Sequence, residues 1–210
     1  MLDSFVRGML DAPLTRVAEV IDRPWVSPDR LTIGGLVVGL SSAAAAAAQW
    51  WGIALVLWLV SRAIDGVDGP LARRRRAHEG PQETMSQAGG FLDITADFIV
   101  YGSTVVGVAV GATAEYDAPW WPFLLVLLTY YVNGTAFLAF SSIAERTGRR
   151  MDDGRSLSFL GGLAEGTETI VVHSVWFLFP AVAWQLALGW AVVVGVSATQ
   201  RVLAGYRDLS

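Results

Sequence analysis

The chain has 210 residues, of which 53% are hydrophobic and 16% are charged, and its mean hydropathy is +0.47. A soluble domain would carry about a quarter charged residues, so this composition favours an integral membrane protein over a soluble enzyme. The net charge of −4 and the lack of a basic patch interleaved with aromatic residues argue against a nucleic-acid partner. Cysteine is absent, which excludes disulfide bonds and thiolate metal sites.

Residues 1–28 are predicted to form an amphipathic helix and a turn. Apolar side chains recur at helical spacing from Leu2 to Ile21, while arginines and acidic residues fall between them on the other side. The segment is too polar to cross a bilayer, so we expect it to lie in the membrane interface. Pro24 and Pro28 end it.

Residues 31–205 are predicted to form a bundle of six transmembrane helices. No charged residue occurs from Leu31 to Ser61, and this run is too long for one helix. Two interfacial tryptophans and a glycine at residues 49–52 divide it. The predicted spans cover residues 31–49, 52–75, 88–112, 121–143, 157–179 and 182–203. The whole chain, residues 1–210, is therefore expected to be one all-α membrane domain.

The arginines predict the orientation of this bundle. Apart from Arg62, they lie in four segments on one side of the predicted membrane: residues 7–30, 73–76, 146–155 and 201–207. The loops on the other side contain Glu115 and Asp117 but no arginine. The positive-inside rule then places both termini and the basic face in the cytoplasm, as in a bacterial inner membrane.

Two pairs of aspartates lie where the second and third spans approach the cytoplasm. Asp65 and Asp68 follow the apolar part of the second span, and Asp93 and Asp97 precede the apolar part of the third. Spacings of three and four residues place each pair on one face of a helix. Four carboxylates at one membrane depth repel each other unless a cation holds them, so the sequence predicts a site for one or two divalent metal ions.

The residues around these aspartates resemble the signature of the CDP-alcohol phosphatidyltransferase family. That signature reads D-x2-D-G-x2-A-R, then a spacer, then G-x3-D-x3-D, and all of its fixed positions are present. In this chain they are Asp65, Asp68, Gly69, Ala72, Arg73, Gly89, Asp93 and Asp97. The likeness extends more loosely to the whole chain, through the N-terminal helix and the six predicted spans.

The resemblance implies an enzyme that transfers a phosphatidyl group from CDP-diacylglycerol to a small polar alcohol and releases CMP. It implies that the four aspartates bind Mg²⁺ or Mn²⁺ and that Asp97 is also the general base for the acceptor hydroxyl. The implied nucleotide-binding residues are Asp65, Gly69, Ala72, Arg73 and Gly89. A homodimer in the lipid bilayer is expected from the family likeness as well.

The spacer between Arg73 and Gly89 departs from the usual family pattern. It holds fifteen residues, which is longer than usual, and it is polar with Gly80-Pro81 near its middle. We expect a long cytoplasmic loop beside the nucleotide. Whether its arginines bind anionic groups or only fix the topology is open at this point.

Four residues are candidates for binding the acceptor: Arg155, Glu165, Glu168 and Arg201. The two arginines lie near the cytoplasmic ends of spans five and six, where they either bind an acceptor phosphate or extend to the interface. The two glutamates either line a cavity or form an internally hydrogen-bonded polar stripe. Glycerol 3-phosphate, serine and an inositol phosphate are all candidate acceptors. His173 is predicted to be a packed, hydrogen-bonded residue rather than a metal ligand.

Two other functions also fit a set of intramembrane acids. A divalent-cation transporter would use them as an ion site, but here they cluster toward one membrane face and no repeat of broken helices is evident. A non-catalytic lipid-binding protein would keep the fold without needing all four aspartates. The metal-dependent transferase is therefore the favoured hypothesis.

Overall fold

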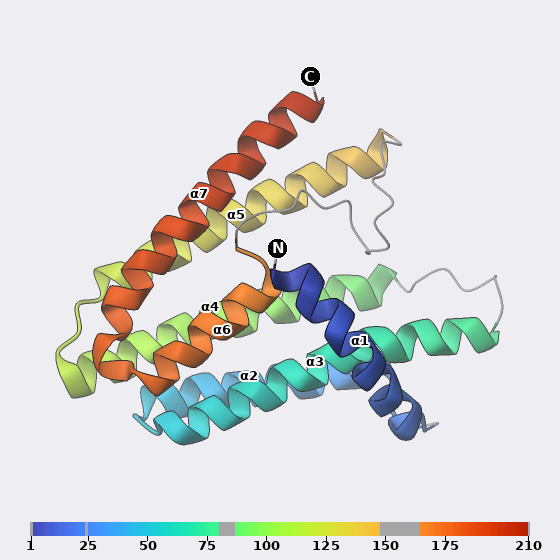
Figure 1. Cartoon of the computed structure of the whole chain (residues 1–210), viewed down its shortest axis with the longest axis horizontal. Coiled ribbons are helices and arrows are strands. Elements are labelled where there is room, and N and C mark those ends of the chain that lie inside the picture. The colour runs from blue at the N-terminus through green and yellow to red at the C-terminus, as the bar shows by residue number, and fades with distance from the viewer. Residues whose placement is uncertain (1, 24, 80–86, 148–163, 210) are drawn as a thin grey trace.

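A computed structural model describes residues 2–23, 25–79, 87–147 and 164–209, and the regular elements within them are all helical. In chain order they are α1 (Leu2–Ile21), α2 (Pro28–Ala47), α3 (Trp51–Glu79), α4 (Gln87–Tyr116), α5 (Trp121–Arg146), α6 (Gly166–Leu178), the short 3-10 helix η1 (Pro180–Val182) and α7 (Ala183–Leu209) (Figure 1). The predicted all-α fold is confirmed.

Four segments of the described chain are long and apolar enough to cross a membrane. They are Pro28–Ala47, Ala88–Tyr116, Trp121–Arg146 and Pro180–Leu209. Helix α3 has sufficient length, but Arg62, Asp65 and Asp68 all fall within its first 18 residues. Helix α6 has only 13 residues. An integral membrane protein is therefore supported, while the crossing of the bilayer by α3 and α6 stays a prediction.

Within the fifth predicted span, residues 157–179, the described helix is α6. Residues 157–163 lie outside the described part of the chain, and Glu165 has an extended backbone, so α6 starts at Gly166. The predicted end of this helix before Pro180 is confirmed.

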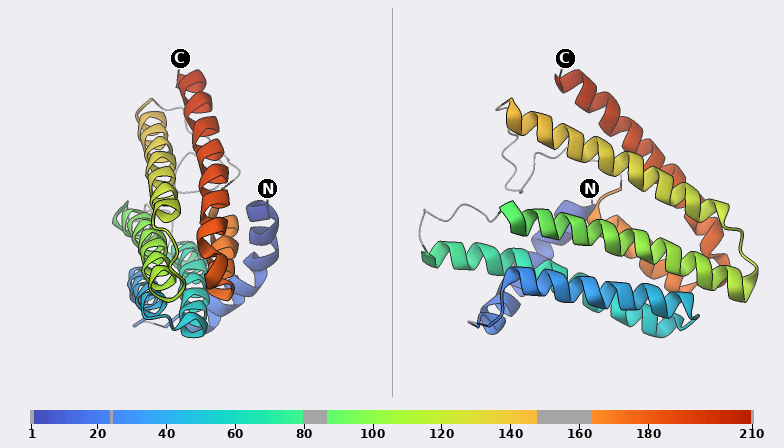
Figure 2. Two further views of the ribbon diagram at one scale, coloured as in Figure 1. Left: turned by 90° about the vertical axis from the view of Figure 1, so that its left-hand side faces the viewer. Right: turned by 180° about the vertical axis from the view of Figure 1, so that it is seen from behind.

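Helix α2 packs against both α3 and α4 (Figure 2). The contact with α4 is very close, because a Cβ atom added at Gly107 would overlap the carbonyl oxygen of Ala43. A Cβ atom at Gly111, one turn later, would overlap the carbonyl oxygen of Ala46. Small residues thus let the two backbones touch, as is common between membrane helices.

Helices α5 and α7 lie side by side and run at an angle to α2, α3 and α4 (Figures 1 and 2). A single buried hydrophobic cluster with members from α2 through α7 joins the two groups. Its largest fully buried side chains include Trp58, Phe123 and Trp176. The helices that carry the aspartates are therefore part of one packed frame.

Helix α1 crosses the outside of α3 (Figure 1). Leu14, Ala18 and Ile21 on α1 share a hydrophobic cluster with Val67 and Leu71 on α3. Leu14 and Ile21 are among the apolar positions that recur at helical spacing in the sequence, and together with Ala18 they bury one face of α1 against the protein.

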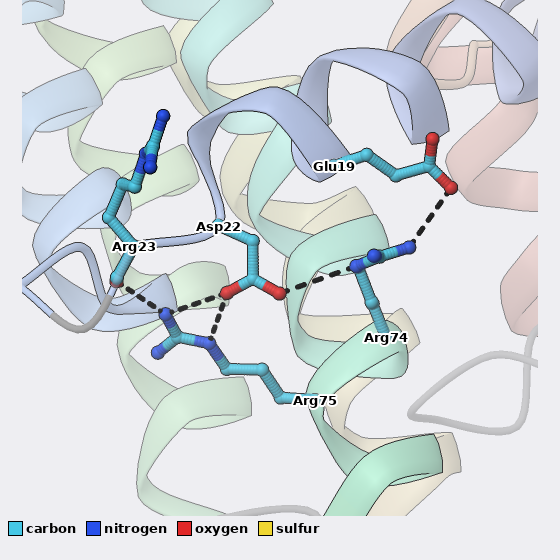
Figure 3. A network of polar contacts seen from close by, with 5 residues as sticks. All are labelled: Glu19, Asp22, Arg23, Arg74 and Arg75. Atoms are coloured by element: carbon cyan, nitrogen blue, oxygen red, sulfur yellow. Dashed lines mark hydrogen bonds and ion pairs between the residues drawn. The ribbon is translucent and has the colours of Figure 1, made fainter.

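A network of charged side chains also joins the end of α1 to α3 (Figure 3). Asp22 accepts hydrogen bonds from Nε and Nη2 of Arg75, at 3.1 and 3.0 Å, and from Nε of Arg74, at 3.3 Å. Arg74 also pairs with Glu19 at 2.9 Å, and Arg75 donates to the carbonyl oxygen of Arg23 at 2.9 Å. The hydrogen bond from Arg75 contributes most to holding the pKa of Asp22 below its usual value, so the carboxylate stays charged.

The predicted loop after Arg73 is wrong for residues 74–79, because α3 continues as a helix to Glu79. Helix α4 begins at Gln87, so only residues 80–86 separate the two helices, and these lie outside the described residues. The network with α1 stabilises the extension, since it satisfies two of its arginines.

The close contact between α2 and α4 yields a stability prediction. Gly107→Ala should destabilise the protein by about 1–3 kcal/mol, because the added methyl group must push the α2 backbone away. Gly102→Ala is the matched control on the same helix, since nothing lies within 4 Å of a Cβ atom there. Thermal unfolding in detergent measures both variants, and equal melting temperatures would contradict the prediction.

Candidate active site

Three of the four aspartates converge between α3 and α4. Asp65 and Asp68 lie one turn apart on α3, and Asp93 lies on α4. One carboxylate oxygen of each residue lies within 4.8 Å of those of the other two. Asp68 is buried, whereas Asp65 and Asp93 are half-buried. Three oxygen ligands at this spacing suit a hard divalent cation such as Mg²⁺ or Mn²⁺.

Helix α2 fixes the side chain of Asp68. The hydroxyl of the buried Thr32 donates a hydrogen bond to Oδ2 of Asp68 at 2.8 Å. Helix α2 starts at Pro28, where the Ser27 hydroxyl caps it by accepting from the Arg30 amide at 3.2 Å. Sequence analysis missed Thr32, because a single threonine in an apolar helix carries no signal of its partner.

Asp97 is outside this group of three and pairs with an arginine. Nη1 of Arg62 on α3 donates to Oδ1 of Asp97 on α4 at 2.5 Å, and it lies 3.5 Å from Oδ2 of Asp65. The side chain of Arg62 is only 5% exposed. Sequence analysis did not include Arg62 in the site. The signal that could have identified Arg62 was its position directly after the charge-free run and one turn before Asp65.

The charge balance of the site fits a divalent metal ion. Among the residues that the structure describes, Arg62 lies within ion-pair distance of two of the four aspartates, Asp65 and Asp97. Four carboxylates beside one guanidinium leave an excess of negative charge in a largely buried position, which is costly without a further cation. The converging oxygens of Asp65, Asp68 and Asp93 are the atoms placed to hold one.

The predicted nucleotide-binding residues of α3 lie on the same face as its aspartates. A Cβ atom added at Gly69 would lie 3.4 Å from Nη1 of Arg73. Apart from the neighbouring backbone of α3 itself, no other described atom would lie within 4 Å of it. The space over Gly69 is therefore bordered mainly by the Arg73 guanidinium. The Arg73 side chain is 61% exposed and lies 3.6 Å from Asp11 of α1. Ala72 lies on α3 and Gly89 lies near the start of α4, and both residues are half-buried.

Three of the four acceptor candidates, Glu165, Glu168 and Arg201, lie in the described part of the chain. Arg201 on α7 is buried and donates from Nη1 to Oδ1 of Asn133 on α5 at 3.2 Å. Glu165 is the residue before α6, and Glu168 lies in the first turn of that helix. Arg155 lies outside the described residues. The roles of these four residues stay predictions.

His173 is a packed residue, as predicted. Its ring is fully buried and shares a hydrogen bond with the Tyr130 hydroxyl at 2.9 Å. Trp190 donates from Nε1 to the same hydroxyl at 2.7 Å, which leaves the hydroxyl proton of Tyr130 for Nε2 of His173. The His173 ring also stacks on Trp176 with 4.6 Å between the ring centres.

Comparison with known proteins identifies related sequences over the full chain. The chain is 34% identical to the inner membrane protein YnjF of Escherichia coli (strain K12), over 100% of this chain and 97% of that protein. It is 27% identical to the archaetidylinositol phosphate synthase of Pyrococcus horikoshii, over 98% of this chain and 97% of that enzyme.

Solved structures with the same fold come from Mycobacterium tuberculosis phosphatidylinositol phosphate synthase. The form with CDP-DAG bound aligns with a TM-score of 0.70 and 19% identity, over 92% of this chain and 93% of that one. The form in complex with manganese and citrate also gives a TM-score of 0.70, with 22% identity over 92% of this chain and 88% of that one.

The sequence model of one family, CDP-alcohol phosphatidyltransferase, matches residues 25–197. This match covers most of the chain and includes both pairs of aspartates. The chain therefore belongs to the CDP-alcohol phosphatidyltransferase family, a family of membrane enzymes in phospholipid synthesis.

Proposed function

We propose that the protein transfers a phosphatidyl group from CDP-diacylglycerol to a small polar alcohol and releases CMP. The observation that carries the proposal is the convergence of Asp65, Asp68 and Asp93 within 4.8 Å, next to the open space over Gly69. The family gives the class of reaction. The structural neighbour with CDP-DAG bound supports this choice of donor.

Mg²⁺ or Mn²⁺ is the proposed cofactor. Asp65, Asp68 and Asp93 would hold it, and Asp97 is a further predicted ligand. Such an ion, when bound, neutralises negative charge on the donor pyrophosphate. The neighbouring structure in complex with manganese supports a divalent ion in this fold.

The cytidine diphosphate part of the donor is proposed to lie along α3, against Asp65, Gly69, Ala72 and Arg73, with Gly89 of α4 opposite. Glycine at position 69 lets a flat group approach the helix backbone. The exposed guanidinium of Arg73 offers paired N–H donors, which match phosphate oxygens.

Asp97 is proposed to be the general base. Its side chain is 34% exposed, so it is accessible to an incoming alcohol. The carboxylate accepts the hydroxyl proton while the alcohol oxygen bonds to the phosphorus of the phosphatidyl group. The bond from that phosphorus to the CMP oxygen breaks, and CMP leaves with the electron pair.

The acceptor is proposed to bind near Arg155, Glu165, Glu168 and Arg201. A buried arginine such as Arg201 is well suited to a phosphate group on the acceptor. An archaetidylinositol phosphate synthase and a phosphatidylinositol phosphate synthase are among the proteins that this chain resembles. An inositol phosphate is therefore the first acceptor to test, followed by glycerol 3-phosphate and serine.

The proposed membrane arrangement treats residues 1–210 as one domain with six spans, so that α3 and α6 also cross the bilayer. Helix α1 would lie in the interface, because Val17 and Val20 are 45% and 72% exposed and are available to enter the acyl layer. The arginine distribution supports a cytoplasmic site and cytoplasmic termini. A relative named as an inner membrane protein supports that membrane. A homodimer is part of the proposal.

A CMP-release assay tests the proposed reaction. The purified full chain in lipid nanodiscs receives CDP-diacylglycerol, Mg²⁺ or Mn²⁺, and one acceptor at a time. Acceptor-dependent CMP release, with the product lipid identified by its mass, is the expected outcome. The absence of CMP release with every acceptor and with both metals would contradict the proposal.

The metal site yields a second prediction. Asp93→Asn should lower Mn²⁺ affinity and turnover by at least about 100-fold. Mutation of a residue that only orients a metal ligand typically lowers metal affinity or activity by about 10–100-fold, and Asp93 is a proposed ligand itself. Electron paramagnetic resonance of bound Mn²⁺ and CMP release measure the two effects, and chelation should abolish wild-type turnover reversibly. Asp117→Asn is the matched control, because Asp117 is exposed with φ of 53°, a conformation that asparagine tolerates. Wild-type Mn²⁺ affinity in Asp93→Asn would exclude this ligand.

The base yields a third prediction. Asp97→Asn should lower kcat by about 10²–10⁴-fold, because the amide keeps the shape of the side chain but cannot accept the proton. Mn²⁺ binding should change much less, since Asp97 is outside the group of three converging oxygens. Full turnover would disprove the role as base. An equal loss of Mn²⁺ binding and kcat would leave Asp97 as a metal ligand without a separate role as the base.

A further inference from the structure

Arg62 approaches the site from the interior of the bundle. Its Nη1 donates to Oδ1 of Asp97 at 2.5 Å and lies 3.5 Å from Oδ2 of Asp65. Its Nη2 donates to the hydroxyl oxygen of Ser61 at 3.1 Å. That hydroxyl donates its own proton to the carbonyl oxygen of Gly35 on α2, at 2.7 Å, so its lone pairs are available to Arg62.

Two aromatic rings confine the same guanidinium. Its central carbon lies 5.4 Å from the ring centre of Trp58 and 5.1 Å from that of Tyr101. Trp58 and Arg62 are one turn apart on α3, and Asp97 and Tyr101 are one turn apart on α4. Each helix therefore supplies one aromatic ring and one member of the ion pair, and the arginine has little freedom to turn away.

The ion pair is buried at one end and open at the other. The side chain of Arg62 is 5% exposed, while that of Asp97 is 34% exposed. The hydrogen bond uses Oδ1 of Asp97, and within the described part of the chain Oδ2 accepts no hydrogen bond. One oxygen is therefore held from the interior and the other is available to the site.

We propose that Arg62 is a positioning residue for the transfer reaction, which acts by holding the carboxylate of Asp97 in the orientation that receives the acceptor proton. This inference rests on the proposed role of Asp97 as the base. It assigns a function to a residue that is not part of the D-x2-D-G-x2-A-R pattern.

A role in charge compensation alone would have different consequences. Loss of a residue that acts only through its charge would change the electrostatics of the whole site, so Mn²⁺ affinity and KM for the donor would change together with kcat. A positioning role confines the loss to the step in which Asp97 takes the proton. The two roles therefore separate in the kinetic constants.

The test is a double-variant cycle in the full chain, with Arg62→Met, Asp97→Asn and the combination. Methionine keeps apolar contact with the two rings but removes the donor and the charge. We expect Arg62→Met to lower kcat by about 10–100-fold, as is typical when a group that orients a reactive residue is lost. KM for the donor and Mn²⁺ affinity should stay within about twofold of the wild-type values. The combined variant should be no slower than Asp97→Asn alone, because Arg62 acts through Asp97.

Arg62→Lys provides the conservative variant. Its ammonium group keeps the charge and one hydrogen bond but not the paired geometry, so it should recover part of the lost kcat. If Arg62→Met does not fold, the cycle is run with Arg62→Lys in its place. Arg16→Met is the matched control, since Arg16 is exposed on α1 and outside the site, and it should keep wild-type kcat.

Three outcomes would overturn the inference, and they are distinguishable. If Asp97→Asn loses turnover while Arg62→Met keeps wild-type kcat, or if the two losses multiply in the combined variant, Arg62 does not position the base and the proposed function stands. If Asp97→Asn keeps full turnover, the assignment of the base fails, and the role of Arg62 fails with it.

Discussion

The repulsion between carboxylates on α3 and α4 is the constraint on which the site depends. Carboxylates this close together in a largely buried region repel each other strongly, because little water is present to screen their charges. They stay together only if the rest of the chain holds them in place. Here the acids lie on long helices rather than on loops. Thr32 holds Asp68, and Arg62 holds Asp97. The fixed excess of negative charge gives the site its attraction for a divalent cation.

Helix α2 contributes to the rigidity of the site through contacts that lie away from the aspartates. Helix α2 touches the α4 backbone at Gly107 and Gly111, and it is joined to α3 where the Ser61 hydroxyl bonds to the Gly35 carbonyl. The same helix supplies Thr32 to Asp68. Helix α2 therefore sets how the two helices that bear the aspartates lie relative to each other, although it contributes no acidic residue to the group of three.

Much of the fold and part of the site could be predicted from the sequence. Charge-free runs and turn residues predicted the helices, and the spacing of the two aspartate pairs predicted the convergence of three of their members, Asp65, Asp68 and Asp93. Family membership also sets aside the transporter and the non-catalytic lipid-binding protein. Helix α3 runs to Glu79, beyond the predicted end of the second span at residue 75, and the contacts of Arg74 and Arg75 with Asp22 and Glu19 join residues more than 50 positions apart in the sequence. The pair of Arg62 and Asp97 was missed because 35 residues separate its members.

The pairing of Arg62 with Asp65 has a consequence for the biogenesis of the protein. The two residues are three apart on one helix and lie within 3.5 Å, so they can pair before any later helix is made. In the proposed six-span arrangement, α3 enters the bilayer ahead of α4 during synthesis. An ion pair within α3 reduces the cost of bringing its charges into the membrane at that stage. When α4 follows, Asp97 reaches an arginine that is already in place.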